Sequence, residues 1–192
     1  MKKCLLTNSN ALFNEIAKNA KLYIPVDLEK GRVAYKEFSD GLKMSDALKT
    51  DRSAKDFFFP QTETLMAFKT QGKNIEIADI RSETEDFVVF GVRACDVKSI
   101  EVLDKVFLAE PVDSYYQNRR EHGIIVSMAC ARPVETCFCQ TFGIDATNPG
   151  GDIVCYKTAD AFYLDANTEK GKALLEKLDA VTEESDDSAV NA

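Results

Sequence analysis

Two nearly uninterrupted apolar segments in the middle of the chain place the strongest constraint on its fold. Phe87–Val92 contains no polar side chain, and Ile124–Ala129 contains one polar side chain, that of Ser127. Such segments are typical of strands that are buried on both faces of a sheet. A helix is expected between them, with Asp96 as its cap and apolar positions at Val97, Ile100, Leu103, Val106 and Phe107. This order of elements predicts a right-handed crossover that joins two parallel strands.

Shorter patterns around this unit predict the remaining elements. We expect helices over residues 8–21, 45–50, 62–70, 114–121 and 168–178, and strands over residues 22–26, 33–38, 153–157 and 161–164. The chain is therefore interpreted as α/β, with a mixed sheet around a central parallel βαβ unit flanked by helices, plus a C-terminal hairpin and helix. Its length suits one domain over residues 1–181, followed by an acidic flexible tail over residues 182–192.

Charge and composition argue against several functional classes. With 24 basic and 32 acidic residues the net charge is −8, so general attraction to nucleic acid or anionic lipid is not expected. No apolar run approaches the roughly 20 residues that a membrane-spanning helix needs. The residues after Met1 lack the apolar core of a signal peptide, so the expected compartment is the cytoplasm.

Six cysteines in a reducing compartment require a chemical explanation, because structural disulfides are disfavoured there. Cys95 closely follows the first apolar strand, and Cys130 directly follows the second. If these strands are parallel, both thiols lie at the carboxyl edge of the sheet, where α/β sheets place their ligands. Cys137 and Cys139 lie in the loop that leaves Cys130, and this loop can fold back over the same edge.

Four thiolates at one edge fit a [4Fe–4S] cluster, which takes one thiolate on each iron. The helix that begins near Cys95 is expected to favour its thiolate through the helix dipole. The Cys-x6-Cys-x-Cys spacing leaves two alternatives open, namely a four-cysteine zinc site that only docks partners, or a metal-free interaction domain with reduced cysteines. Cys4 and Cys155 are interpreted as packing residues, because one is isolated and the other lies inside an expected strand.

Four motifs occur in a fixed order along the chain: Asp56–Leu65, Gly91–Val97, Tyr115–Glu121 and Cys130–Cys139. Together they resemble the N-terminal region of a family of iron–sulphur subunits, which comprises the β-type subunits of sulfhydrogenases and their counterparts in anaerobic sulfite reductase. The resemblance extends to about residue 180. It implies a [4Fe–4S] cluster on the second and fourth motifs, with the ligands Cys95, Cys130, Cys137 and Cys139. It also implies an electron-relay component, rather than a complete catalyst, that works with a catalytic subunit and with a flavin-containing electron-transfer subunit.

The chain departs from the family pattern in two places. Family members usually continue into a two-cluster ferredoxin-type domain, so the expected partners include such a domain, which is missing from this chain. Ala94 stands where the motif normally has proline, a small change that should leave the ligand geometry intact. The pattern Gly-x-Gly-x-x-Gly is absent, so NAD or FAD is not expected on this chain.

Residues around the cysteines carry further expectations. Phe138 and Phe142 are expected to be exposed beside the cysteine loop, because an electron relay must approach its partner closely. Without a cluster, the loop over residues 131–142 is expected to be displaced, disordered or closed by a disulfide. Arg93 is expected to offset cluster charge, whereas Arg119 and Arg120 are expected in surface ion pairs.

Overall fold

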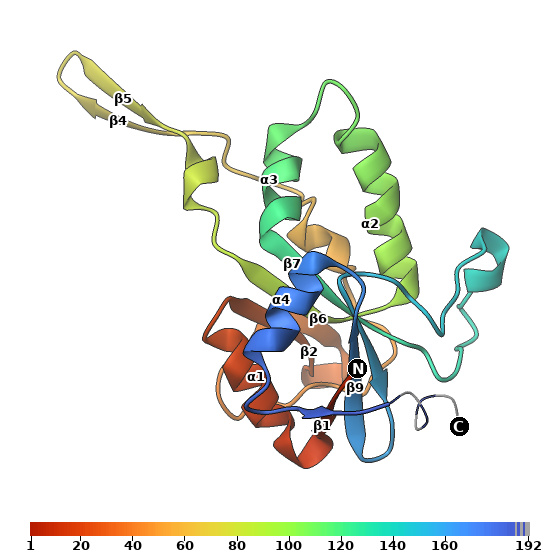
Figure 1. The fold of residues 1–192 in the computed structure, drawn as a ribbon. Helices are drawn as coiled ribbons and strands as arrows, with labels where there is room; N and C mark the ends of the chain where they lie inside the picture. Colours follow the sequence, from red (N-terminus) through yellow and green to blue (C-terminus); the bar gives the residue numbers. More distant parts are fainter. Residues whose placement is uncertain (187, 189, 191–192) are drawn as a thin grey trace.

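The computed structural model describes residues 1–186, 188 and 190, without the side chains of residues 82 and 83. Within this part of the chain, a mixed sheet of 8 strands has the order β10-β1-β9-β8-β7-β6-β2-β3 (Figure 1). The strands are β1 (Lys2–Leu5), β2 (Lys21–Asp27), β3 (Val33–Glu37), β6 (Phe87–Val92), β7 (Gly123–Met128), β8 (Ile153–Lys157), β9 (Ala161–Ala166) and β10 (Glu183–Glu184). The predicted α/β class with a mixed sheet is confirmed.

The centre of this sheet is parallel. β6 pairs in parallel with β7 from Phe87↔Gly123 to Val92↔Ser127, and β2 and β8 extend the parallel part on either side. The connection from β6 to β7 contains two helices, α2 (Ala94–Phe107) and α3 (Ser114–His122). The predicted crossover is therefore confirmed. The predicted cap is wrong, because Arg93 occupies the N-cap position and Asp96 lies in the first turn.

Both faces of the sheet are covered by helices, because the buried strands alternate their side chains between the faces. On one face, α1 (Ser9–Ala17) and α4 (Glu169–Lys177) pack over Val88, Phe90 and Val126. On the other face, α2 and α3 pack over Phe87, Val89 and Ile125. The continuous apolar run of β6 is thus explained by two separate cores, one on each face, to which both β6 and β7 contribute.

A bulge at Gly91 changes the alternation of β6 near its end. The register passes from Phe90↔Val126 directly to Val92↔Ser127, which leaves Gly91 unpaired. Gly91 has a φ of +86°, and a Cβ at this position would lie 3.3 Å from the ring of Pro25. Only glycine adopts this conformation readily. Because of the extra residue, Val92 joins the core beneath α2 and α3.

Two predicted helices are not present. Residues 45–50 are irregular, and they are held against β2 and β3 by bonds from Ser45 N to Pro25 O and from Asp51 N to Val33 O. Residues 62–70 contain the start of a separate antiparallel hairpin, formed by β4 (Ala67–Gln71) and β5 (Asn74–Ala78). Both corrections arise from tertiary contacts or strand alternation that outweigh local helix preference.

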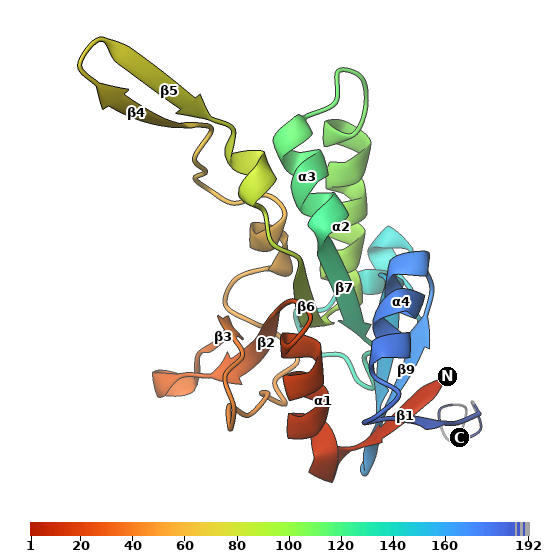
Figure 2. The same cartoon turned by 60° about the vertical axis from the view of Figure 1, so that its left-hand side comes forward.

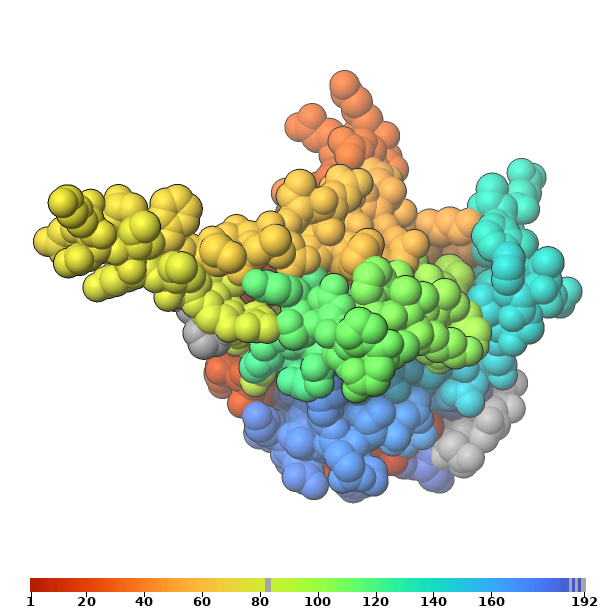
Figure 3. All heavy atoms as spheres, turned by 90° about the horizontal axis from the view of Figure 1, so that it is seen from above, coloured from red at the N-terminus to blue at the C-terminus, as the bar shows by residue number. Residues whose placement is uncertain are grey.

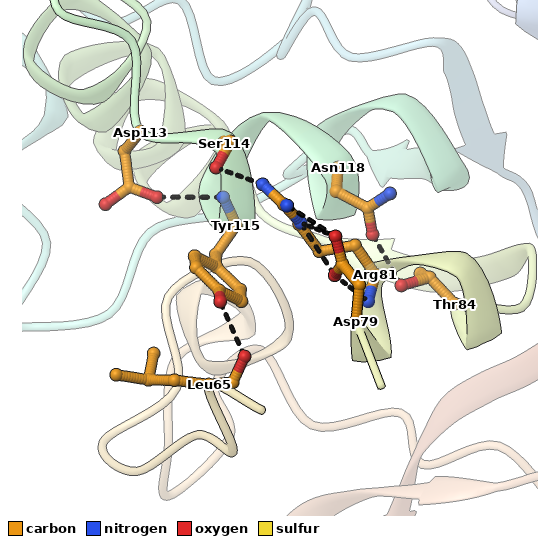
Figure 4. A network of polar contacts seen from close by, with 8 residues as sticks. All are labelled: Leu65, Asp79, Arg81, Thr84, Asp113, Ser114, Tyr115 and Asn118. Carbon is orange, nitrogen blue, oxygen red and sulfur yellow. Dashed lines mark hydrogen bonds and ion pairs between the residues drawn. The ribbon is translucent and has the colours of Figure 1, made fainter. Parts of the chain in front are cut away.

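The β4–β5 hairpin projects from the body as an arm (Figures 1 and 2). Phe68 pairs with Ile77 and Thr70 with Ile75, so these side chains share one face of the hairpin. Phe68, Ile75 and Ile77 are 66–70% exposed. At the base of the arm, Tyr115 donates to the carbonyl of Leu65, Arg81 donates to Ser114, and Thr84 donates to Asn118 (Figure 4). These bonds between described residues fix the base of the arm to α3.

A strand near each end of the chain lies at one edge of the sheet. β10 pairs with β1 through Lys2↔Glu184 and Lys3↔Glu183, and Lys2 also forms ion pairs with Asp179 and Glu184. The flexible tail over residues 182–192 stays a prediction, because residues 187, 189, 191 and 192 lie outside the described residues. Among the helices of the described part, none is long and apolar enough to cross a membrane.

The packing of α4 gives a test of the fold. A Cβ on Gly171 would lie 2.2 Å from the carbonyl oxygen of Asp152, so α4 must carry glycine where it crosses this backbone. We predict that Gly171→Ala lowers the free energy of unfolding by about 3 kcal/mol, although alanine normally gains up to about 1 kcal/mol in a helix. Urea unfolding should show this loss, with Glu176→Ala, an exposed position in the same helix, as the control. An unchanged or raised midpoint in Gly171→Ala would contradict the close approach.

Candidate cysteine site

Four cysteines line a single pocket at the carboxyl ends of β6 and β7. The pocket has a volume of about 780 Å³, and its walls include Cys95, Cys130, Cys137 and Cys139. Cys95 lies in the first turn of α2, Cys130 lies just beyond β7, and the other two lie in the following loop. In Figure 3 this loop, coloured teal, protrudes on the opposite side of the molecule from the arm. The parallel pairing thus brings the predicted residues to one place.

The thiols share the pocket, but they do not form a site for a single metal ion within the described residues. Among the described residues, no three Cys, His, Asp or Glu side chains lie close enough together to hold one metal ion. All six cysteines are free thiols. Cys4 and Cys155 lie in the core with exposed fractions of 2% and 0%, so their interpretation as packing residues is confirmed.

The cysteine loop is folded mainly by its own backbone. The amide of Cys137 donates to the carbonyl of Val134, and the amide of Val134 lies 3.4 Å from the Cys137 sulphur as a donor. A short 3-10 helix, η5 (Cys139–Phe142), ends at Gly143, which has a φ of +60°. The loop then returns, and the amide of Cys130 donates to the carbonyl of Ala146. These bonds hold the loop over the sheet edge.

The electrostatics of Cys95 differ from the prediction. Burial raises the pKa of its thiol, and the neighbouring charges of Asp96 and Cys139 raise it further. Backbone amides at the start of α2 act in the expected direction and lower this pKa, but they are outweighed. The predicted effect of α2 is therefore present, but burial outweighs it and the pKa of the Cys95 thiol is raised.

Burial and Arg93 shift the pKa of the Cys130 thiol in opposite directions. Burial raises the pKa of the Cys130 thiol, whereas the nearby Arg93 guanidinium lowers it through its charge and a contact of 4.0 Å to the sulphur. The net direction is upward. Binding of a metal centre through these thiols would therefore release protons to solvent.

The pocket wall is more basic than the chain as a whole. Apart from the thiols, its charged lining residues within the described part of the chain are the cations Lys49, Arg93 and Arg132 and the carboxylate Asp145, in a chain with a net charge of −8. Lys49 donates to Thr136, which connects the irregular segment beside β3 to the cysteine loop. Sequence reasoning missed Lys49, because only the long-range contacts of residues 45–51 bring it to the pocket.

Two exposed aromatic rings lie beside the cysteines. Phe138 and Phe142 are 62% and 63% exposed, and their ring centroids lie 5.6 Å apart in an edge-on arrangement. Phe138 lies between Cys137 and Cys139, and Phe142 follows three residues after Cys139. The predicted exposure of this aromatic pair is confirmed.

The remaining motif residues support the scaffold rather than the pocket. Arg119 forms a two-pronged ion pair with Glu63 and donates to the carbonyl of Phe58, so the first and third motifs pack together. Arg120 pairs with Asp104 on α2 in the same two-pronged way. Arg119 and Arg120 thus form ion pairs as predicted, but these pairs are half-buried and not on the surface.

Comparison with known proteins agrees with the resemblance seen in the sequence. The chain is 33% identical over 177 residues to sulfhydrogenase 2 subunit beta of Pyrococcus furiosus. The chain is thus similar to a sulfhydrogenase β subunit. The match includes 90% of this chain but only 51% of the relative, so this chain spans about half the length of the curated relative that it matches. No family model and no solved structure matches the chain.

The burial of the cysteines predicts a two-class pattern of reactivity. In the metal-free, reduced protein, we expect iodoacetamide to modify Cys95, Cys130, Cys137 and Cys139 while Cys4 and Cys155 are protected. Burial both blocks access to Cys155 and raises the pKa of its thiol. Peptide mass spectrometry should locate the modified residues, and the same reaction in concentrated urea should modify all six. Early modification of Cys155 under native conditions would contradict its assigned place in the core.

Proposed function

We propose that this chain binds one [4Fe–4S] cluster through Cys95, Cys130, Cys137 and Cys139 and relays single electrons within a multisubunit, cytoplasmic, anaerobic oxidoreductase of the hydrogenase or sulfite reductase type. The observation that carries this proposal is the shared pocket, which is lined by all four cysteines although they come from two strand ends and a loop. The relationship to a sulfhydrogenase β subunit supports the oxidoreductase context.

The chemistry of the pocket fits the proposed group. Iron–sulphur clusters are held by thiolates, and the pocket presents four thiols and no histidine. A volume of about 780 Å³ is larger than a single ion needs. A bound cluster with four thiolates carries negative charge, which Lys49, Arg93 and Arg132 can offset. Such a cluster supplies one-electron transfer.

The chain's own residues have distinct parts in this proposal. Cys95 and Cys130 are supplied by rigid elements, because they follow β6 and β7 in the parallel core. Cys137 and Cys139 are supplied by the exposed loop, whose bonds are mostly local, so this half of the ligand set can adjust to the bound group. Ligand binding is then coupled to ordering of the loop.

The partners are also part of the proposal. Phe138 and Phe142 form an exposed apolar edge beside the thiols, where a neighbouring redox centre could approach. The proposed neighbours in the complex are a ferredoxin-type domain, a catalytic subunit and the flavin-containing electron-transfer subunit. The molecule that matches this chain is itself called a subunit, in agreement with an assembly of several chains.

Anaerobic reconstitution with iron and sulphide tests the ligand set. The wild-type protein should bind about four irons and four sulphides per chain and should give charge-transfer absorbance that bleaches on reduction. We predict that Cys95→Ser loses most of this cluster, because a hard hydroxyl replaces a soft thiolate on one iron. Cys155→Ser is the matched control, since the same change in the core should cost about 1 kcal/mol of stability and leave the iron content unchanged.

The same experiment separates the alternatives. One zinc per chain after native purification, with no uptake of iron, would indicate the structural zinc site, and uptake of neither metal would indicate a metal-free interaction domain. Equal cluster loading in Cys95→Ser and the wild type would remove Cys95 from the ligand set. In the reconstituted protein, Cys137→Ser and Cys139→Ser should increase proteolysis of the loop over residues 131–142, because its ordering depends on the bound group.

A further inference from the structure

Arg93 connects three segments that form the walls of the cysteine pocket: the segment around Ala47, the end of β7 and the start of α2. The Arg93 guanidinium donates from Nη2 to the carbonyl of Ala47 at 3.3 Å and from Nη1 to the carbonyl of Ala129 at 3.4 Å. The same Nη1 lies 4.0 Å from the sulphur of Cys130. The side chain is half-buried, so these contacts are less screened than those of a surface arginine.

The backbone of Arg93 is bonded to the start of α2, the third wall of the pocket. Its carbonyl accepts from the amides of Asp96 and Val97, which makes Arg93 the N-cap of the helix that carries Cys95. Arg93 therefore connects the start of α2, the end of β7 and the irregular segment beside β3. This segment continues to Lys49, whose side chain donates to Thr136, next to Cys137. A planar guanidinium can donate to several acceptors at fixed angles, whereas a lysine ammonium acts as a compact charge on a flexible stem.

The positive charge of Arg93 also lies beside the sulphur of Cys130, a proposed cluster ligand. Reduction adds an electron to a cluster that is already negatively charged with its thiolates, so a nearby fixed cation stabilises the reduced form more than the oxidised form. Hydrogen bonds to the ligand sulphurs act in the same direction. Arg132 lines the same pocket but is exposed, so water screens its charge more strongly.

On the basis of the proposed function, we propose that Arg93 is the positioning residue of this site: it joins the pocket walls that carry Cys95 and Cys130 and raises the reduction potential of the cluster through its contact with the Cys130 sulphur. The two roles depend on different properties of the side chain. Joining the walls requires the fork of donors, whereas raising the potential requires the positive charge.

Three variants of the reconstituted protein separate these roles. Arg93→Gln removes the charge and the fork, and it should both lower the midpoint potential and accelerate loss of iron to a chelator. Arg93→Lys keeps the charge, so its potential should stay close to the wild-type value while iron loss is again accelerated several-fold. Arg132→Gln removes a charge of the same sign from the same pocket, and it should change both quantities much less. Redox titration followed by electron paramagnetic resonance gives the potential, and visible absorbance gives the rate of iron loss.

The outcomes distinguish this inference from the proposed function. A wild-type protein that takes up no iron–sulphur cluster overturns both. A wild type that loads normally, with an unchanged potential in Arg93→Gln, overturns the electrostatic role of Arg93 alone. If Arg93→Gln does not fold, Arg93→Lys still decides the positioning role, because wild-type retention of iron in that variant would show that the fork of donors is dispensable.

Discussion

The parallel pairing of β6 with β7 is the interaction on which the arrangement of the cysteines depends. Parallel strands end at the same edge of a sheet, so the segments after Val92 and Met128 must begin side by side. An antiparallel pairing of the same two strands would place Cys95 and Cys130 at opposite ends of the fold. The crossover through α2 and α3 is long enough to allow parallel pairing, and both helices bury the outer face of the strands that they connect.

Rigidity is unevenly distributed around the pocket. Cys95 and Cys130 are attached to strands with fully buried neighbours such as Val89 and Val126, so their backbone positions are fixed by the core. Cys137 and Cys139 lie in a loop whose side chains are largely exposed and whose bonds are mostly local. The site therefore combines a fixed half with an adaptable half. In the proposed cluster site, two ligands would come from the fixed half and two from the loop.

The sequence predicted the interior of the fold well and its periphery less well, for physical reasons. Phe87–Val92 could be assigned because burial on both faces leaves a continuous apolar run. The arm was missed although Ile75 and Ile77 alternate with polar residues around the turn at Gly72, because an exposed hairpin has no core to explain its apolar face. Lys49 could not be assigned to the pocket, since distant backbone contacts alone determine where its segment lies.

The bulge at Gly91 has a consequence for how the chain tolerates changes in length. The bulge accommodates one residue more than β7 has opposite it, so Phe90 and Val92 pair with the consecutive residues Val126 and Ser127. Deletion of this one residue would leave Val92 opposite Ser127 and on the face of α2 and α3, where it lies now. Loss of the bulge residue would therefore need no compensating change before Cys95, whereas loss of a paired residue such as Val89 would shift the register of the residues around it.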